Sequence, residues 1–225
     1  PIPTRKSVPK HVYAPAKPRR VRSRPWVLAA LICLLTIVMV SASAPLWTSR
    51  DPGAMAPEAQ FFPPDWQHPA GTDLFGRDLA TRLLYGGRYT LGIAAAAVLL
   101  AMLPGTLLGL AAGYFGGWTD RLISWLVDVI LAFPSILLAL IIVAALGPGI
   151  ANVILAVGIA GIPQYTRLVR GQVLSARRAA YVRAAITIGC THGRIVFRHI
   201  LPNLLGSIIV LATLNVGGAI LNASA

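Results

Sequence analysis

Four long uncharged stretches constrain this chain more than any other feature of its sequence. They cover residues 25–49, 89–119, 129–166 and 199–225, the last if His199 is neutral, and the longest contains 38 residues. A helix needs about 20 consecutive apolar residues to cross a bilayer. The chain is also 56% hydrophobic and only 12% charged, which excludes a soluble enzyme, a disordered chain and a disulfide scaffold. We therefore expect an all-α polytopic membrane protein.

The charged residues are sorted along the chain by sign. Eight of the 20 Lys and Arg residues lie in the first 24 positions and seven more lie in residues 167–198, and neither segment contains an acid. All seven acids lie in residues 51–128. Cytoplasmic segments of membrane proteins carry an excess of Lys and Arg. We interpret the net charge of +13 as a marker of membrane orientation with a cytoplasmic N-terminus, in preference to nucleic-acid binding.

These patterns divide the chain into four parts. We expect a basic cytoplasmic tail at 1–25, a first transmembrane helix at 26–48 and an external loop at 49–88. A transmembrane core at 89–225 follows, and it contains a cytoplasmic loop at 167–201.

The first apolar stretch has a secretory signal peptide as its alternative interpretation. Ala42, Ser43 and Ala44 resemble a cleavage site. However, the apolar stretch exceeds the 7–15 residues of a signal-peptide core, and Pro45 would directly follow the cut. We favour a retained helix.

The end of the external loop predicts a short amphipathic helix at 72–89. Thr72 or Asp73 is suited to cap its start, and Leu79 and Leu83 share one helical face. We expect this helix to lie flat at the membrane surface.

Glycines recur at every fourth residue in the second expected span. Gly105, Gly109 and Gly113 leave room for a neighbouring backbone. They predict a helix-packing role in preference to a role in substrate binding.

A carboxylate and a proline interrupt the third expected span. Asp128 and Arg121 lie on one helical face, and a carboxylate near hydrocarbon is costly unless it is paired. We expect an ion pair between Asp128 and either Arg121 or an arginine in residues 167–170. A role of Asp128 in a transport pathway is the alternative. Pro134 should kink the span.

The basic cytoplasmic stretch predicts two short helices joined at a glycine corner. Ala184 and Ala185 belong to the first helix, and Gly189 suits the left-handed residue after a helix end. Thr191 can cap the second helix, and Pro202 is suited to begin the next span. A plain connector needs none of these features, so we expect a segment shaped to enter the cleft of a partner.

This stretch also resembles a known motif. The motif reads Glu-Ala-Ala, three residues, Gly, nine residues, Ile, one residue and Leu-Pro. The corresponding residues here are Tyr181-Val182-Arg183-Ala184-Ala185, Gly189 and Leu201-Pro202. Arg183 replaces the glutamate and His199 the isoleucine. With these replacements the stretch resembles the coupling loop of ABC importer permeases, in the branch for dipeptides, oligopeptides and nickel.

Further motifs at 68–73, 76–78, 112–118 and 131–134 resemble the same branch, so the resemblance covers about residues 67–219. It implies the helical bundle of a type I importer permease, with five spans in this chain and a sixth after Ala225. It also implies a second, C-type, permease of a bacterial inner membrane that forms half of the translocation pathway. The implied partners are a homologous permease, two cytoplasmic ATPases and an external solute-binding protein.

The sequence contains no catalytic constellation, no metal-ligand spacing and no Gly-x-x-x-x-Gly-Lys-Ser/Thr phosphate loop. We expect no enzymatic activity and no cofactor in this chain, and we expect ATP to be bound by the partner subunits. An ion-coupled secondary transporter is one alternative, but it needs ionisable groups along a path, and Asp128 is the only candidate. A non-transporting membrane scaffold is the other.

The predicted orientation can be tested directly. Arg183 should be cytoplasmic and Glu58 external, because positive charge concentrates on the cytoplasmic side. Single cysteines at these two positions, in a background without Cys33 and Cys190, are exposed to an impermeant thiol reagent in intact cells. Label is expected at position 58 and not at position 183, and the reverse result would contradict the orientation.

Overall fold

The computed structural model describes residues 25–224, so the expected basic tail lies almost wholly outside the described residues. The chain forms two units, Pro1–Ile37 and Val38–Ala225. Within the first unit the described part belongs to a single helix, α1 (Pro25–Ala42), which continues into the second unit. Everything below concerns the second unit.

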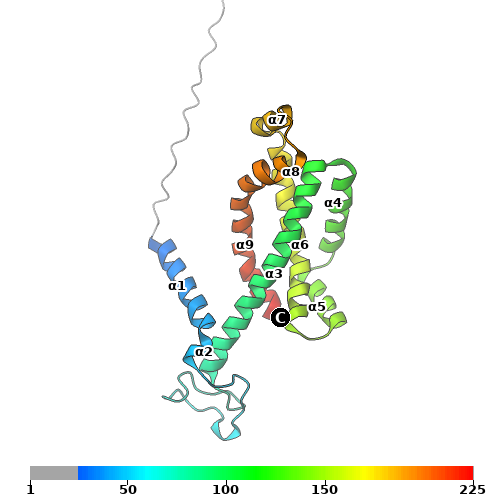
Figure 1. Cartoon of the computed structure of the whole chain (residues 1–225). Helices are drawn as coiled ribbons and strands as arrows, with labels where there is room; N and C mark the ends of the chain where they lie inside the picture. Colours follow the sequence, from blue (N-terminus) through cyan, green and yellow to red (C-terminus); the bar gives the residue numbers. More distant parts are fainter. Residues whose placement is uncertain (1–24, 225) are drawn as a thin grey trace, which may run out of the picture. The chain divides into compact units, whose positions relative to one another are not determined.

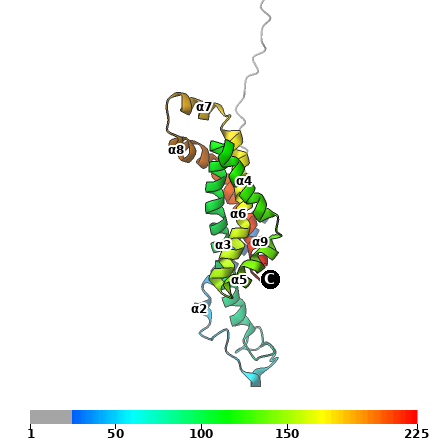
Figure 2. The same ribbon diagram turned by 90° about the vertical axis from the view of Figure 1, so that its right-hand side faces the viewer.

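The regular elements of residues 25–224 are helices, as predicted (Figure 1). After α1 they are α2 (Ala44–Trp47), a 3-10 turn (Pro57–Ala59), α3 (Leu79–Phe115), α4 (Gly117–Leu131), α5 (Ser135–Leu146), α6 (Ile150–Ala176), α7 (Ala180–Thr187), α8 (His192–Arg194), a π-helical turn (Ile195–Ile200) and α9 (Leu201–Ser224). Figures 1 and 2 show α3, α6 and α9 bundled together, with α7 beyond one end and the loop before α3 at the other.

Two described helices are long and apolar enough to cross a membrane by themselves, namely α3 and the continuous helix His192–Ala223. The pair α4 and α5 makes a third candidate if it is counted as one bent span. These helices confirm an all-α membrane protein. The count of five spans stays a prediction, because α1 and α6 are not among the candidates.

Close packing of α3 against α6 organises the bundle. A Cβ atom built on Gly105, Gly109 or Gly113 would lie 2.7 Å from the Cβ atom of a residue on α6. The three facing residues are fully buried: Tyr165, Val169 and Val173. Each glycine meets the residue 60 positions later, so the two helices run parallel and in register. The predicted packing role of these glycines is confirmed.

The expected interfacial helix at 72–89 is wrong. The helix begins at Leu79, and its cap is Asp78, whose side chain accepts a hydrogen bond from the Thr81 amide. From there α3 continues without interruption to Phe115. The Gly86-Gly87 pair disfavours a helix at this point but does not interrupt it, and packing on α6 stabilises the continuous helix.

Pro134 has a larger effect than a kink. The helix breaks after Leu131, and α5 starts at Ser135 at an angle of 85° to α4. Proline lacks an amide hydrogen and pushes the residue before it away from helical geometry. The break therefore leaves backbone outside any helix at residues 132–134.

The register of α3 on α6 predicts the effect of adding one methyl group. Gly109→Ala places a Cβ atom 2.7 Å from that of Val169, and such overpacking costs about 1–3 kcal/mol. Gly92→Ala is the matched control, because nothing lies within 4 Å of its Cβ position. We expect a lower midpoint of thermal unfolding in detergent for Gly109→Ala only. Equal midpoints for both variants would contradict the packing role.

Candidate functional site

The motif at 68–78 holds together the loop that precedes α3. Asp73 accepts hydrogen bonds from the backbone amides of Phe75 and Arg77, and it pairs with the guanidinium of Arg77 at 2.8 Å. A second guanidinium, from Arg82 on α3, lies 2.9 Å from the same carboxylate. Partial burial acts to raise the pKa of Asp73, but these hydrogen bonds and charges outweigh it and hold the pKa below its ordinary value.

Two glycines of this motif permit a tight loop. Gly71 and Gly76 have φ angles of +74° and +68°. A Cβ atom on Gly76 would overlap the carbonyl oxygen of Ala56. A Cβ atom on Gly71 would lie 2.6 Å from the carbonyl oxygen of Phe62. The motif therefore folds into a tight loop that positions the start of α3.

At the opposite end of the bundle, α7 forms a short arm over the helix ends (Figure 1). Gly189 turns the chain after α7 with a φ of +79°, as predicted. Val182 and Ala185 face inward and are buried in the main hydrophobic cluster, which also contains Ile195 and Ile200. The arm is thus packed firmly on the chain's own core.

This packing corrects the expectation that both alanines meet a partner. Ala185 is only 5% exposed, whereas Ala184 is exposed. The outward face of the arm, which we call the coupling face, consists of Tyr181, Arg183, Ala184, Ile186 and Ile188. Ile188 is 79% exposed, and burying such apolar surface on a partner is favourable.

The segment after the corner also differs from expectation. Thr191 occupies the cap position of α8 but makes no capping hydrogen bond through its side chain. Pro202 does not begin a span, because one helix runs on from His192 through the π-helical turn into α9. A π turn inserts an extra residue and so accommodates the amide that proline lacks. Leu201 and Pro202 therefore lie inside a continuous helix.

A contact between aromatic and imidazole groups ties this helix to α3. The hydroxyl of Tyr114 lies 2.8 Å from Nδ1 of His192. The guanidinium carbon of Arg177 lies 5.7 Å from the centre of the Tyr114 ring, within the range of a cation–π contact. Together with α7, these groups join α3, α6 and α9 at this end of the bundle.

Two ion pairs brace α4 against α6. Asp128 pairs with Arg167 at 2.7 Å, which is the second of the two predicted partners. The pairing with Arg121 is wrong, since Arg121 makes no ion pair within residues 25–224. Both Asp128 and Arg167 are more than half exposed in this chain, where such a pair contributes little.

The stronger brace involves Asp120, which sequence reasoning missed. Arg170 binds Asp120 through two hydrogen bonds, from Nε to Oδ1 and, at 2.7 Å, from Nη2 to Oδ2. Two-point binding of this kind fixes orientation as well as distance. The spacing of 50 residues gave no local signal in the sequence.

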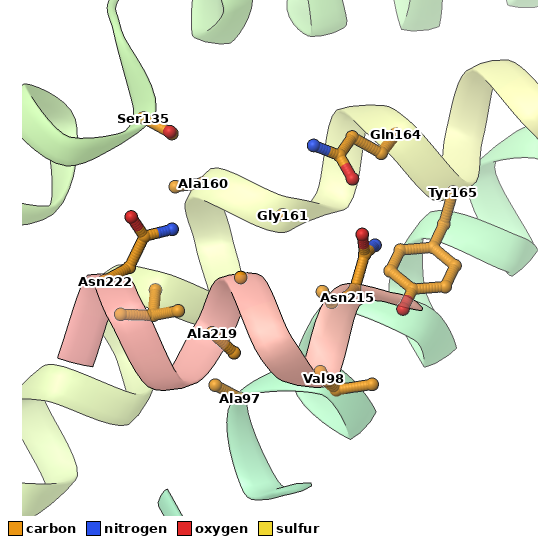
Figure 3. A pocket seen from close by; sticks show the side chains of 13 residues that line it. Ala97, Val98, Ser135, Ala160, Gly161, Gln164, Tyr165, Asn215, Ala219 and Asn222 are labelled. Carbon is orange, nitrogen blue, oxygen red and sulfur yellow. The ribbon is translucent and has the colours of Figure 1, made fainter. Parts of the chain in front are cut away.

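A polar pocket between the helices was also missed. Figure 3 shows Gln164 and Tyr165 of α6, Asn215 and Asn222 of α9 and Ser135 of α5 around it. Its volume is about 80 Å³. Asn, Gln, Tyr and Ser scattered through apolar stretches carried no recognisable motif, and only helix packing brings them together.

The family described as the binding-protein-dependent transport system inner membrane component matches residues 105–225. The chain belongs to this family. The matched part contains the glycine register, the coupling face and all the polar residues that line the pocket.

Named relatives agree with this assignment. A dipeptide transport system permease protein of Alkalihalophilus pseudofirmus is 44% identical over 92% of this chain and 68% of its own length. A glutathione transport system permease protein of Pectobacterium atrosepticum is 44% identical over 72% of this chain and 54% of its own length. A probable D,D-dipeptide transport system permease protein of Escherichia coli is 36% identical over 91% of this chain. The chain thus spans about half to two thirds of these relatives.

The two neighbouring alanines provide a test of the arm's packing. Ala185→Trp forces an indole into the buried cluster, and overpacking of this kind costs about 1–3 kcal/mol or more. Ala184→Trp adds the same group on the exposed face and should leave stability unchanged. We expect lower yield and a lower unfolding midpoint for Ala185→Trp alone. Equal destabilisation by both would contradict the assignment of inner and outer faces.

Proposed function

We propose that this chain is a permease subunit of an ATP-driven importer of dipeptides and related small peptides. Membership of the binding-protein-dependent transport family supports a role in transport. The names of the relatives favour peptides as the solute. The structural observation that carries the proposal is the coupling face, an exposed apolar surface held rigidly on the cytoplasmic ends of the spans.

The coupling face transmits motion because it is packed on the bundle. A cytoplasmic ATPase that closes on ATP pushes on α7 through Ile186 and Ile188. Val182 and Ala185 pass this displacement to the π-helical turn and α9, with which they share one buried cluster. The hydrogen bond between Tyr114 and His192 extends it to α3. Packed interiors move as units, so a small shift of α7 reorients the spans.

The assembly that this mechanism requires has four further subunits. A homologous permease completes the translocation pathway, and two cytoplasmic ATPases bind and hydrolyse ATP. A solute-binding protein delivers peptide to the external side. The chain itself supplies no catalysis and no cofactor, and it lies in the inner membrane of a bacterium with its N-terminus in the cytoplasm.

The external loop is suited to meet the binding protein. Trp66 is fully exposed and Phe61 is 68% exposed, and the exposed acids Asp51, Glu58 and Asp65 surround them in the sequence. Aromatic side chains with a charged rim are typical of protein interfaces.

The coupling role is tested in the complete complex, purified with its ATPases and reconstituted with binding protein and peptide. Ala184→Trp adds bulk to the coupling face without touching the buried cluster. We expect it to weaken ATPase retention and to reduce peptide-stimulated ATP hydrolysis at least tenfold, the factor that corresponds to about 1.4 kcal/mol.

Ala54→Trp is the matched control, because Ala54 is also exposed but lies in the external loop. It should retain the ATPases fully. If Ala184→Trp retains the ATPases and shows normal stimulated hydrolysis, α7 does not transmit motion from the ATPases. That result would contradict the proposed coupling.

A further inference from the structure

The uncharged part of α6 places the polar pocket of Figure 3 at the depth of a membrane interior. On α6 the residues from Ile150 to Thr166 are uncharged, and the first arginine is Arg167. A helix rises 1.5 Å per residue, so this stretch covers most of the roughly 30 Å hydrocarbon layer. Val157 and Gly161, which line the pocket, lie within it, at least five residues from either end.

The groups that line the pocket are polar but uncharged. Carboxamides come from Gln164, Asn215 and Asn222, and hydroxyls come from Ser135 and Tyr165. The α3 side is apolar and is formed by small residues such as Ala97 and Ala101. Each carboxamide both donates and accepts hydrogen bonds, so the pocket offers both functions without a net charge.

One of these groups lacks a partner in the described structure. Tyr165 is completely buried, and its hydroxyl makes no hydrogen bond of ordinary geometry within residues 25–224. The carboxamide of Asn215 is the neighbouring polar group (Figure 3). A buried hydroxyl without a partner costs about 1–3 kcal/mol. Because this hydroxyl has almost no accessible surface, the accessible carboxamides of Gln164, Asn215 and Asn222 are the groups that meet a molecule in the pocket.

The broken helix shows that this side of the bundle does not face lipid. Residues 132–134 lie outside any helix and are exposed in this chain. Ser135, directly after the break, lines the pocket together with Gln164, so the break lies at the same depth. Free backbone groups at this depth are tolerated only against protein or a water-filled cavity. The pocket therefore lies on a face that meets a pathway or a partner subunit.

We propose that this pocket is a subsite of the transport pathway that binds the backbone amide of a passing peptide. This inference rests on the proposed function and adds the chemistry of the site. Carboxamides and hydroxyls pair with the N–H and C=O of an amide, whereas a charged terminus would remain uncompensated here. A volume of about 80 Å³, against ~30 Å³ per water molecule in the liquid, admits one amide group and its immediate neighbours.

The chemistry predicts discrimination between a dipeptide and its ester analogue, which lacks the amide hydrogen. Both are delivered at saturating binding protein to the complete reconstituted complex, so that steps within the permease determine the rates. One lost hydrogen bond changes a rate by about tenfold. We expect the wild type to transport the amide about tenfold faster than the ester.

Asn215→Leu and Asn222→Leu replace a carboxamide by an apolar group of similar size. Each should slow transport of the amide and leave the ester nearly unchanged, so that the preference falls below about threefold. Thr213→Val on the outer side of α9 is the matched control and should keep the full preference. An unchanged preference in both Asn variants, or equal slowing of both substrates, would overturn the amide subsite.

A direct measurement covers the case in which these variants fold poorly. Asn215→Cys, in the background without Cys33 and Cys190, is treated with a small thiol reagent. Labelling slowed severalfold by a saturating dipeptide supports the subsite, and labelling unaffected by peptide means that the pocket holds only water and overturns it. Absence of any ATP-driven peptide uptake by the wild type would instead contradict the proposed function, so the two failures are distinguishable.

Discussion

Direct contact between the glycines of α3 and the side chains of α6 sets the positions of the other helices in the bundle. Gly105, Gly109 and Gly113 allow the two helix axes to approach closely, and Tyr165, Val169 and Val173 fill the space that the missing side chains leave. Dispersion contacts in so close a packing are numerous. Because the helices are parallel and in register, their corresponding ends are fixed relative to each other. The 68–78 motif before α3 and the α7 segment after α6 are both attached to this pair of helices.

The bundle is tightly packed at one end, and along one side it has a broken helix and a polar pocket. At one end, α7 shares a buried cluster with the π-helical turn and α9, and the Asp120–Arg170 pair holds α4 to α6. Along the open side the α4–α5 helix is broken, and the polar pocket lies beside the break. This arrangement suits ATP-driven transport. A displacement of α7 at the rigid end can then change the access of solute to the polar pocket on the open side.

Proline is used in three different ways in this chain. Pro134 lies in the break between α4 and α5, directly before α5, whereas Pro163 and Pro104 lie inside continuous helices. Pro202 lies just after a π-helical turn, which accommodates its missing amide. The difference arises from packing: the buried Pro163 is stabilised by neighbouring helices, whereas the residues around Pro134 are exposed in this chain. The same residue type therefore predicts a disturbance but not its size.

Several features followed from the sequence because they depend on local chemistry. Long uncharged stretches require helices in a membrane, glycines at every fourth residue form a flat face, and Gly189 permits a left-handed corner. The tertiary structure alone decided which groups meet. Helical periodicity places Ala184 and Ala185 on different faces but does not say which face the core covers. Similarly, the choice of Arg167 over Arg121 and the meeting of Tyr165 with Asn215 depend on contacts between helices that are far apart in sequence, and no local pattern encodes such contacts.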